Sequence, residues 1–216
     1  YFHYTSNNTI FGTQFKKTPI AHCPILVDMS SDIFSKSIDV SHFDLIYAGA
    51  QKNMGPAGTT LYIVNKESLG KTRRELTPYF DFRNHIEKDS MLNTPPVFSV
   101  YVSMLVLEWL KANGGIKAIE EKNEEKASLI YNEIDTNPLF KGTAEIPDRS
   151  IMNATFVLEN EALKDEFDKL WTEAGISGIK GHRSVGGYRA SMYNALPKES
   201  VTALVEVMQA FGQKFG

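Results

Sequence analysis

Short apolar runs separated by turn-forming residues fill the first third of the chain. Four of them are short enough for single β-strands and are bounded by Asn, Gly, Pro, Ser or Asp; they cover residues 1–5, 25–27, 45–48 and 60–64. Short continuous apolar runs between turn signals are typical of buried strands. The pattern therefore predicts part of a largely buried sheet in this region.

Two later segments have the spacing of amphipathic helices instead. Between residues 97 and 112 apolar side chains recur at spacings of three and four, which predicts a helix with a broad apolar face, and Asn113-Gly114-Gly115 ends it. Residues 116–134 place Ile and Ala on one side of a second helix and a dense run of Glu and Lys on the other. Such a charge run is typical of a solvated face.

The pattern changes character again in the last third of the chain. Residues 152–158 alternate as in a half-exposed strand, 163–174 have helical spacing, and apolar residues from 201 to 211 mark a closing helix. Strands and helices mixed in this way are typical of an α+β unit. We therefore predict an α/β protein with a large domain in residues 1–114 and a smaller α+β domain in residues 115–216.

Composition narrows the classes of partner. The 216 residues are 42% hydrophobic, enough for a real core, and the formal net charge of -3 lacks the basic field that nucleic acid binding needs. No apolar run reaches the roughly 18 residues of a membrane span. The single cysteine, Cys23, excludes an internal disulfide framework and a cysteine metal cluster, and fits a reducing compartment. These features predict a cytoplasmic protein without nucleic acid or membrane partners.

One lysine lies where chemistry would be expected. The segment AGAQKNMGPAGT, with Lys52 at its centre, reads as a tight loop between two buried strands. Its glycines let the backbone bend sharply and approach a ligand closely. Burial would lower the pKa of the Lys52 amine and free it as a nucleophile. A solvated loop lysine is the alternative from this segment alone.

A carboxylate upstream changes the weight of these alternatives. Asp28 ends the apolar run 25–27, where a carboxylate is costly unless a positive group pairs with it. A protonated pyridine nitrogen would be such a partner, although an aspartate before Ser30-Ser31 is also common in turns. Together, Lys52 and Asp28 suggest pyridoxal phosphate, since a lysine forms its Schiff base and an aspartate keeps its ring nitrogen protonated.

Three other polar residues could bind the same cofactor. Thr9 follows the first strand and could donate to a phenolic or phosphate oxygen, although a plain turn explains its segment equally well. Asn93 and Thr94 supply an amide and a hydroxyl just before a predicted helix, where free backbone N–H groups favour anions. An ordinary capping turn with two prolines is the alternative for these two.

A Gly-rich segment near the C-terminus offers groups for an anionic substrate. Arg183 and Arg189 lie within GHRSVGGYRAS, and an arginine fork matches a carboxylate or phosphate in a bidentate way. With His182 they suit a doubly anionic substrate, whereas surface arginines are the plain alternative. His182 has no carboxylate or cysteine close to it in the sequence, so no metal site is predicted.

Five segments, in order along the chain, resemble motifs of the phosphoserine aminotransferases, a family of fold type I enzymes that depend on pyridoxal phosphate. They are HYTSNNTIFGT, DMSSDIFSKSIDV, AGAQKNMGPAG, SMLNTPP and GHRSVGGYRASMYNALP. They span nearly the whole chain, which resembles the C-terminal three-fifths of that family. The resemblance implies part of the large, mainly parallel-sheet cofactor domain, followed by the smaller C-terminal domain that closes the site.

The resemblance implies cofactor roles for residues near the predicted strand ends. Lys52 matches the lysine that binds pyridoxal phosphate covalently, and Asp28 matches the aspartate that faces the pyridine nitrogen. Thr9 matches a threonine near the cofactor's O3′, and Gln51 matches a residue that reaches its phosphate. These four residues would form one side of the cofactor site.

Other matches concern the second subunit and the substrate. Asn93 and Thr94 match residues that the family contributes to the phosphate site of the other subunit, which implies a homodimer with shared active sites. Arg189 matches the arginine that binds the substrate α-carboxylate. His182 and Arg183 match residues that hold the distal phosphate or carboxylate.

The resemblance also implies an activity. It is the transamination between O-phospho-L-serine and 2-oxoglutarate that gives 3-phosphohydroxypyruvate and L-glutamate in L-serine biosynthesis. Two alternatives stay open. One is another fold type I aminotransferase or lyase, and the other is an inactive truncated fragment that acts only as a structural or dimerising module.

Two departures from the family qualify these expectations. Asn8 stands where the family usually has an acidic residue. The family's N-terminal part, which carries the Gly-rich turn for the cofactor phosphate and the aromatic residue that stacks on the ring, has no counterpart in this sequence. We therefore expect the chain to hold pyridoxal phosphate poorly by itself and to need that part, for example as a separate N-terminal fragment.

Overall fold

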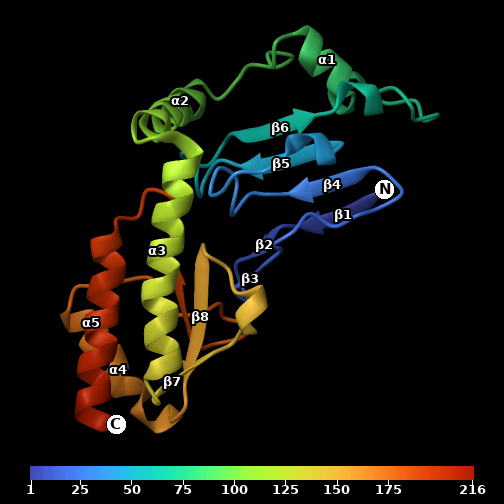
Figure 1. Ribbon diagram of the computed structural model, residues 1–216. Coiled ribbons are helices and arrows are strands. Elements are labelled where there is room, and N and C mark those ends of the chain that lie inside the picture. The colour runs from blue at the N-terminus through green and yellow to red at the C-terminus, as the bar shows by residue number, and fades with distance from the viewer.

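The computed structural model describes residues 1–216, and its first half is built on a four-stranded sheet (Figure 1). The strands β1 (Phe2–Thr5), β4 (Ile25–Asp28), β5 (Leu45–Gly49) and β6 (Thr60–Val64) lie in the order β1-β4-β5-β6. Strands β1, β4 and β5 run parallel, and β6 is antiparallel to β5. The predicted α/β class with a mainly parallel sheet is confirmed.

The parallel register brings three chain segments to one edge of this sheet. Thr5 at the end of β1 pairs with Asp28 at the end of β4, and Asp28 pairs in turn with Tyr47 of β5. The hairpin of β2 (Asn7–Asn8) and β3 (Thr13–Gln14), the turn after β4 and the loop after β5 therefore all leave the sheet at its carboxyl edge. Open α/β sheets bind their ligands outside that edge.

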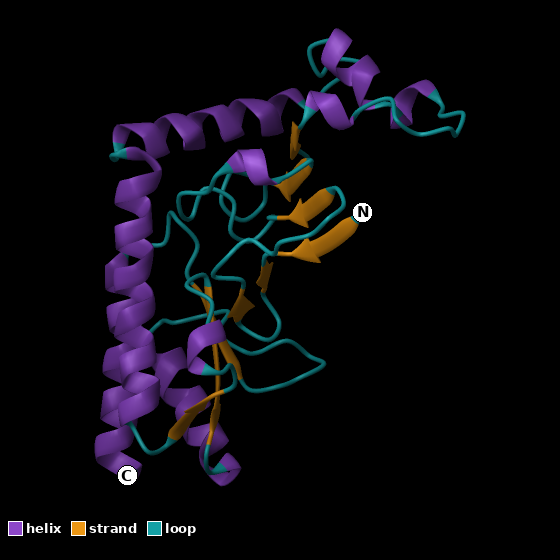
Figure 2. Cartoon of the chain, turned by 45° about the vertical axis from the view of Figure 1, so that its right-hand side comes forward, coloured by secondary structure: helices purple, strands orange, loops and turns teal.

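Two long helices meet at a corner beyond the sheet. α2 (Val97–Ala112) passes near β6, and α3 (Gly115–Thr136) turns away from it toward the second half of the molecule (Figures 1 and 2). Gly114 and Gly115 make the corner with φ angles of 95° and 71°, which glycine adopts without a side-chain penalty. The predicted end of the first helix at these glycines is therefore confirmed.

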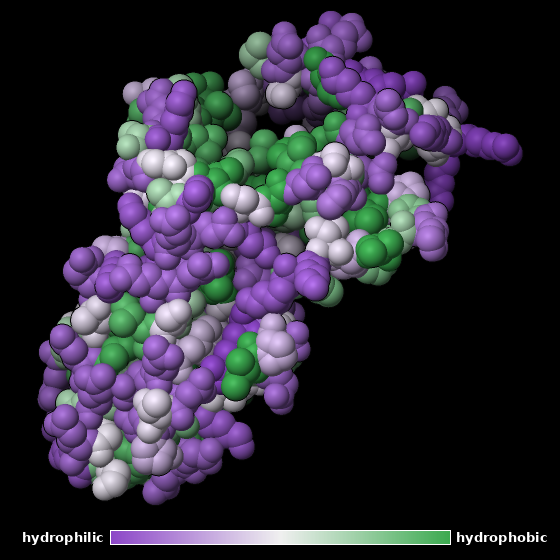
Figure 3. Space-filling view, in the orientation of Figure 1, coloured by the Kyte–Doolittle hydropathy of each residue, from purple (hydrophilic) through white to green (hydrophobic).

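The apolar face of α2 is largely exposed. Phe98 is 73% exposed and Tyr101 is 54% exposed. Figure 3 shows apolar surface gathered in the region where α2 and β6 lie in Figure 1. The buried side chains of the helix include Ser99 and Ser103. The helix thus packs on the rest of the chain largely through small polar residues.

Two glycines of the loop after β5 make this packing possible. A Cβ atom at Gly55 would lie 2.9 Å from Ser103 Oγ, and one at Gly58 would lie 2.8 Å from Ser99 Oγ. Both glycines also have positive φ angles, of 153° and 115°. The sequence predicted that these glycines admit a ligand; in the structure they admit helix α2.

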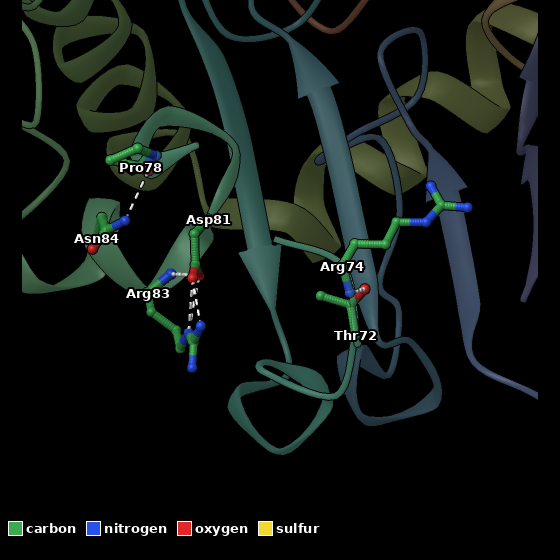
Figure 4. Close-up of polar contacts among 6 residues, drawn as sticks. All are labelled: Thr72, Arg74, Pro78, Asp81, Arg83 and Asn84. Atoms are coloured by element: carbon green, nitrogen blue, oxygen red, sulfur yellow. Dashed lines mark hydrogen bonds and ion pairs between the residues drawn. The ribbon is translucent and has the colours of Figure 1, made fainter. Parts of the chain in front are cut away.

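Local polar contacts shape the segment between β6 and α2 (Figure 4). Asp81 caps the short helix α1 (Phe82–Glu87), where it accepts from the backbone N–H of Arg83 at 3.0 Å and from the Arg83 guanidinium at 2.6 Å. Asn84 donates to the Pro78 carbonyl at 2.8 Å. These bonds join residues close in sequence, so they order the segment without joining it to the sheet.

The second half of the chain combines helices with a three-stranded antiparallel sheet. Its strands β7 (Phe140–Gly142), β8 (Asn153–Leu158) and β9 (Tyr188–Ser191) lie in that order. Helix α3 contacts β7 and β8, and α5 (Lys198–Phe215) packs against both α3 and α4 (Lys164–Glu173). A cluster of 18 buried apolar residues lies here, and a separate cluster of 10 lies around the first sheet. The two clusters support the division at residues 114 and 115, which stays a prediction.

Strand β8 is more buried than its alternation predicts. Val157 is the only one of its residues that is not buried, so the half-exposed strand expected from the sequence is wrong. Helix α3 contacts the strand, and the β2–β3 hairpin covers it as well, where Thr155 Oγ1 donates to the Phe11 carbonyl at 3.0 Å. A strand covered on both sides buries its polar residues too.

The charged side of α3 also differs from the expectation. Lys126 is 2% exposed and Glu133 is 7% exposed, so a wholly solvated face is wrong. The Lys126 amine donates to the carbonyls of Met192 and Tyr193, and the Glu133 carboxylate accepts from Gln209 of α5. The segment after β9 and helix α5 therefore cover part of the Glu and Lys run.

No helix of the structure is long and apolar enough to cross a membrane. No group of three or more His, Cys, Asp or Glu side chains is arranged to hold a metal ion. The thiol of Cys23 is exposed and free.

Candidate active site

Lys52 lies in the loop that follows β5, held between buried neighbours. The N–H of Ala50 donates to the Thr59 carbonyl at 2.9 Å, and the Ala50 carbonyl accepts from the N–H of Gly55 at 2.9 Å. Ala50 is fully buried, and Asn53 is 6% exposed. These contacts close the loop on itself, so the half-buried Lys52 is presented from a fixed backbone.

The surroundings of Lys52 favour its neutral amine. Burial is the main cause that lowers the pKa of the amine, and the positive charge of Arg189 adds to it. Asp28 and Asp32 act in the opposite direction. The net pKa shift is downward, as expected for a nucleophilic amine and not for a freely solvated one.

Asp28 has features of both alternatives that the sequence left open, a turn residue and a carboxylate placed to pair with a positive group. As the last residue of β4 it stands at the carboxyl edge of the sheet, close enough to act on Lys52 through its charge. Its Oδ1 also accepts from the N–H of Ser30 at 2.8 Å, which is the expected turn contact. The Ser30 hydroxyl accepts in turn from the N–H of Gly49 at 3.0 Å. The turn therefore orients the carboxylate at the sheet edge.

Arg189 reaches the same edge from the second half of the chain. From β9 its Nη1 donates to the Thr9 carbonyl at 3.0 Å, across 180 positions of sequence. Its Nε is buried and has no partner within the chain. Buried donors are almost always paired, so an unpaired guanidinium nitrogen indicates an acceptor that belongs there. The structure thus brings Thr9, Asp28, Lys52 and Arg189 to one place.

The other predicted substrate residues lie in a turn before β9. His182 Nδ1 is 2.7 Å from Ser184 Oγ, and the N–H of Gly186 donates to the His182 carbonyl at 2.9 Å. Arg183 is exposed on this turn and has no polar partner within the chain. The turn also approaches β8 closely, since a Cβ at Gly187 would lie 2.8 Å from the carbonyl oxygen of Phe156.

No hydrogen bond or ion pair joins the other three predicted cofactor residues to Lys52. Gln51 is exposed, and its side chain lies over Gly49. Asn93 and Thr94 are also exposed, and Asn93 lines a cavity of about 450 Å³ beside β6. Their predicted service to a second subunit stays a prediction.

Sequence reasoning missed a buried polar cluster beside Lys52. Asp32 is 5% exposed and accepts hydrogen bonds from Ser6 and, at 3.1 Å, from Gln14 Nε2. Burial raises the pKa of the Asp32 carboxyl, against the opposing effect of these bonds. The segment DMSSDIFS contains this residue, but nothing in its pattern distinguishes a buried aspartate from a second turn residue.

Comparison with known proteins identifies the family. The Aminotransferase class-V family matches residues 1–204. The chain is 64% identical over 214 residues to the phosphoserine aminotransferase of Flavobacterium psychrophilum, covering 99% of this chain and 60% of that protein. The chain thus spans about 60% of the length of this relative.

Solved structures agree with this result. The phosphoserine aminotransferase from Bacillus circulans subsp. alkalophilus superposes with a TM-score of 0.94 at 44% identity, over 100% of this chain and 60% of that one. The pyridoxal-phosphate-bound phosphoserine aminotransferase from Trichomonas vaginalis gives a TM-score of 0.90 at 38% identity, over 97% of this chain and 60% of that one. The resemblance inferred from the sequence motifs is confirmed.

The cofactor indicated by this family is pyridoxal phosphate, and the groups at the sheet edge fit it. Lys52 offers an amine with a lowered pKa and Asp28 offers a carboxylate for a cationic ring nitrogen. The buried, unpaired Nε of Arg189 suits the carboxylate of an amino acid bound beside them. By sequence, fold and site, the chain belongs to the class-V aminotransferase family.

Proposed function

We propose that the complete protein is a phosphoserine aminotransferase, which exchanges an amino group between O-phospho-L-serine and 2-oxoglutarate to give 3-phosphohydroxypyruvate and L-glutamate in L-serine biosynthesis. The observation that carries the proposal is the meeting of Lys52, Asp28 and Arg189 at the carboxyl edge of the sheet. The identity of 64% to a relative of that name supports the choice of substrate.

Lys52 would hold the cofactor and then move a proton. Pyridoxal phosphate, when bound, supplies an electron sink that makes the α-hydrogen of an amino acid acidic. Burial lowers the pKa of Lys52 and so favours its neutral amine, which is the only form that can accept a proton. The protonated amine can then deliver this proton to the cofactor.

Asp28 would stabilise the positive ring nitrogen of the cofactor by its charge. The contact of Oδ1 with the Ser30 N–H holds the carboxylate in one orientation, so it need not reorganise during the reaction. Thr9 and Gln51 are proposed to bind oxygen atoms of the cofactor. Thr9 also serves the site through its backbone, since its carbonyl holds Arg189.

Arg189 would bind the carboxylate shared by both substrates. Its Nη1 bond to Thr9 fixes the plane of the guanidinium, while Nε is left for a ligand. His182 and Arg183 would hold the distal group, which is a phosphate in one substrate and a carboxylate in the other. The exposed turn that carries them can adapt to both.

We also propose a homodimer in which Asn93 and Thr94 complete the site of the partner subunit. Both residues are exposed, and they directly precede α2, whose apolar side chains are exposed as well. A large exposed apolar patch is typical of a protein interface.

The single, exposed Cys23 supports a reducing compartment, so we propose the cytoplasm as the location.

Chemical trapping tests the proposal. Borohydride reduction of the complete protein with pyridoxal phosphate should attach the cofactor to the peptide that contains Lys52, as read by mass spectrometry. Lys52→Ala should lose this label, while a matched variant of an exposed lysine, Lys66→Ala, should keep it. Covalent label in the Lys52→Ala protein would contradict the assignment.

A substrate panel separates the proposal from its alternatives. Phosphoserine should react much faster than serine or alanine; equal rates would favour another transaminase or lyase of this fold. The 216-residue chain should be assayed alone and with the missing N-terminal part added as a separate fragment, because the inactive-fragment hypothesis predicts activity in neither case. Activity only with the added fragment would match our expectation for the missing cofactor contacts.

A further inference from the structure

A buried lysine in the middle of α3 has no carboxylate partner. Lys126 is 2% exposed, and its Nζ donates to the carbonyls of Met192 at 3.2 Å, Tyr193 at 3.0 Å and Leu196 at 3.1 Å. Burial lowers the pKa of this amine to about 8. Removing an amine from water has a cost, so the fold must gain something from its position. The gain lies in the segment that its three bonds gather.

That segment joins the two halves of the candidate site. It follows directly on β9, which carries Arg189, and it contains Asn194, which is 6% exposed. The N–H of Asn194 donates to Asn53 Oδ1 at 3.0 Å. Asn53 is the next residue after Lys52. The three carbonyls held by Lys126 flank Asn194 on both sides.

Asn194 is bound at every polar group of its side chain. Its Nδ2 donates to the Phe34 carbonyl at 3.0 Å, and its Oδ1 accepts from Asn123 Nδ2 at 2.9 Å. Asn123 lies one helical turn before Lys126 and donates also to the Ser35 carbonyl at 3.1 Å. Phe34 has a φ of 59°, a conformation that a bulky residue adopts only when its surroundings hold it there.

We propose that Lys126 is a positioning residue for Lys52, acting through Asn194. It folds the segment after β9 so that Asn194 docks on Asn53, and this contact holds the loop after β5 at the sheet edge. The same segment anchors the end of β9, so Lys126 sets the relative placement of Lys52 and Arg189. The contacts do not depend on the proposed reaction, which enters only through the role of Lys52.

Hydrogen exchange in the complete protein, with its cofactor, tests this coupling. Lys126→Met leaves three carbonyls without their donor, and we expect amide exchange in residues 50–55 to become about tenfold faster. Lys122→Met is the matched control, because Lys122 is exposed one turn earlier on the same helix. It should leave exchange in residues 50–55 unchanged.

A pH profile of Lys52 separates positioning from a general loss of stability. Reductive methylation of the cofactor-free complete protein, read at Lys52 by mass spectrometry, reports the pKa of its amine. Lys126→Met should move this pKa upward, toward the ordinary lysine value, because a loosened loop admits water. Methylation at neutral pH should then be about threefold slower. The readout needs no transaminase activity, so it can succeed even if the proposed function fails.

Asn194→Ala provides an independent test that leaves Lys126 in place. It should produce the same two changes at residues 50–55 and Lys52, and the double variant should show less than the sum of the single effects, because the residues act in series. A lower melting temperature with unchanged exchange at residues 50–55 and unchanged Lys52 titration would overturn the proposal. If Lys126→Met does not fold, the result for Asn194→Ala decides alone.

Discussion

Two lysines, one at the sheet edge and one in the middle of α3, show how partners decide what burial does. Burial lowers the pKa of both Lys52 and Lys126. The Lys126 amine donates hydrogen bonds to three backbone carbonyls, whereas the Lys52 amine has charged neighbours and no hydrogen-bond partner. The first amine is therefore occupied by the fold, and the second is free for a ligand.

The largest effect is expected from a substitution at Lys52. Lys52→Ala should reduce kcat/KM of the complete protein by about a thousandfold or more, because both the covalent link and the proton-transfer group are lost. The free energy of unfolding should change little, since the half-buried amine makes no hydrogen bond. Steady-state kinetics and urea unfolding measure the two effects. A large loss of stability would show that Lys52, too, serves the fold.

The reverse should hold at Lys126. Lys126→Met should lower the free energy of unfolding by about 3 kcal/mol, because three buried carbonyls lose their donor. Urea unfolding measures the loss, and Lys122→Met should stay close to the unchanged protein. A loss no greater than that of the control would mean that water can replace the amine.

A substitution at Arg189 tests the side of the site that is proposed to bind the substrate. Arg189→Lys keeps the positive charge but removes the fork, so the KM for phosphoserine should rise about thirtyfold while the unfolding free energy changes little. Initial rates over a range of substrate concentration measure this effect. An unchanged KM would mean that the unpaired Nε does not face the substrate.

The titration of Lys126 should be visible in stability. Its pKa is about 8 in the folded chain against an ordinary value of 10.5, so the unfolded chain binds more protons between these values. Stability relative to Lys126→Met should therefore rise with pH across this window, by at most about 1.4 kcal/mol per pH unit. Urea unfolding of both proteins at several pH values measures the difference. A difference that falls with rising pH would contradict the assigned shift.

The smallest effect concerns the glycines beside Lys52. Gly58→Ala meets both a φ of 115° and Ser99 Oγ at 2.8 Å, and should lower the unfolding free energy by about 1–2 kcal/mol. Gly186→Ala is the control, because Gly186 has a φ of 73° but open space around its Cβ position. Thermal unfolding of the pair separates the strain of the backbone from the contact with α2; equal losses would show that the contact is unimportant.

Local sequence patterns were enough to predict the strands, the long helices and the candidate residues at the sheet edge. Apolar runs between turn residues predict strands because that pattern depends only on neighbouring positions, and the observed bounds of β1, β4, β5 and β6 follow it closely. The motifs around Lys52, Asp28 and Arg189 indicated the family, which the relatives confirm.

The roles of the buried polar residues follow from tertiary packing and not from local sequence. The sequence pattern predicts the wrong exposure for strand β8 and for Lys126, because burial depends on segments far away in the sequence that pack over a position. The link from Lys126 through Asn194 to Asn53 joins residues 123–126, 192–196 and 53, and no local pattern contains such a contact. Side-chain periodicity describes one element at a time, whereas a buried polar group is defined by the partners that several elements bring to it.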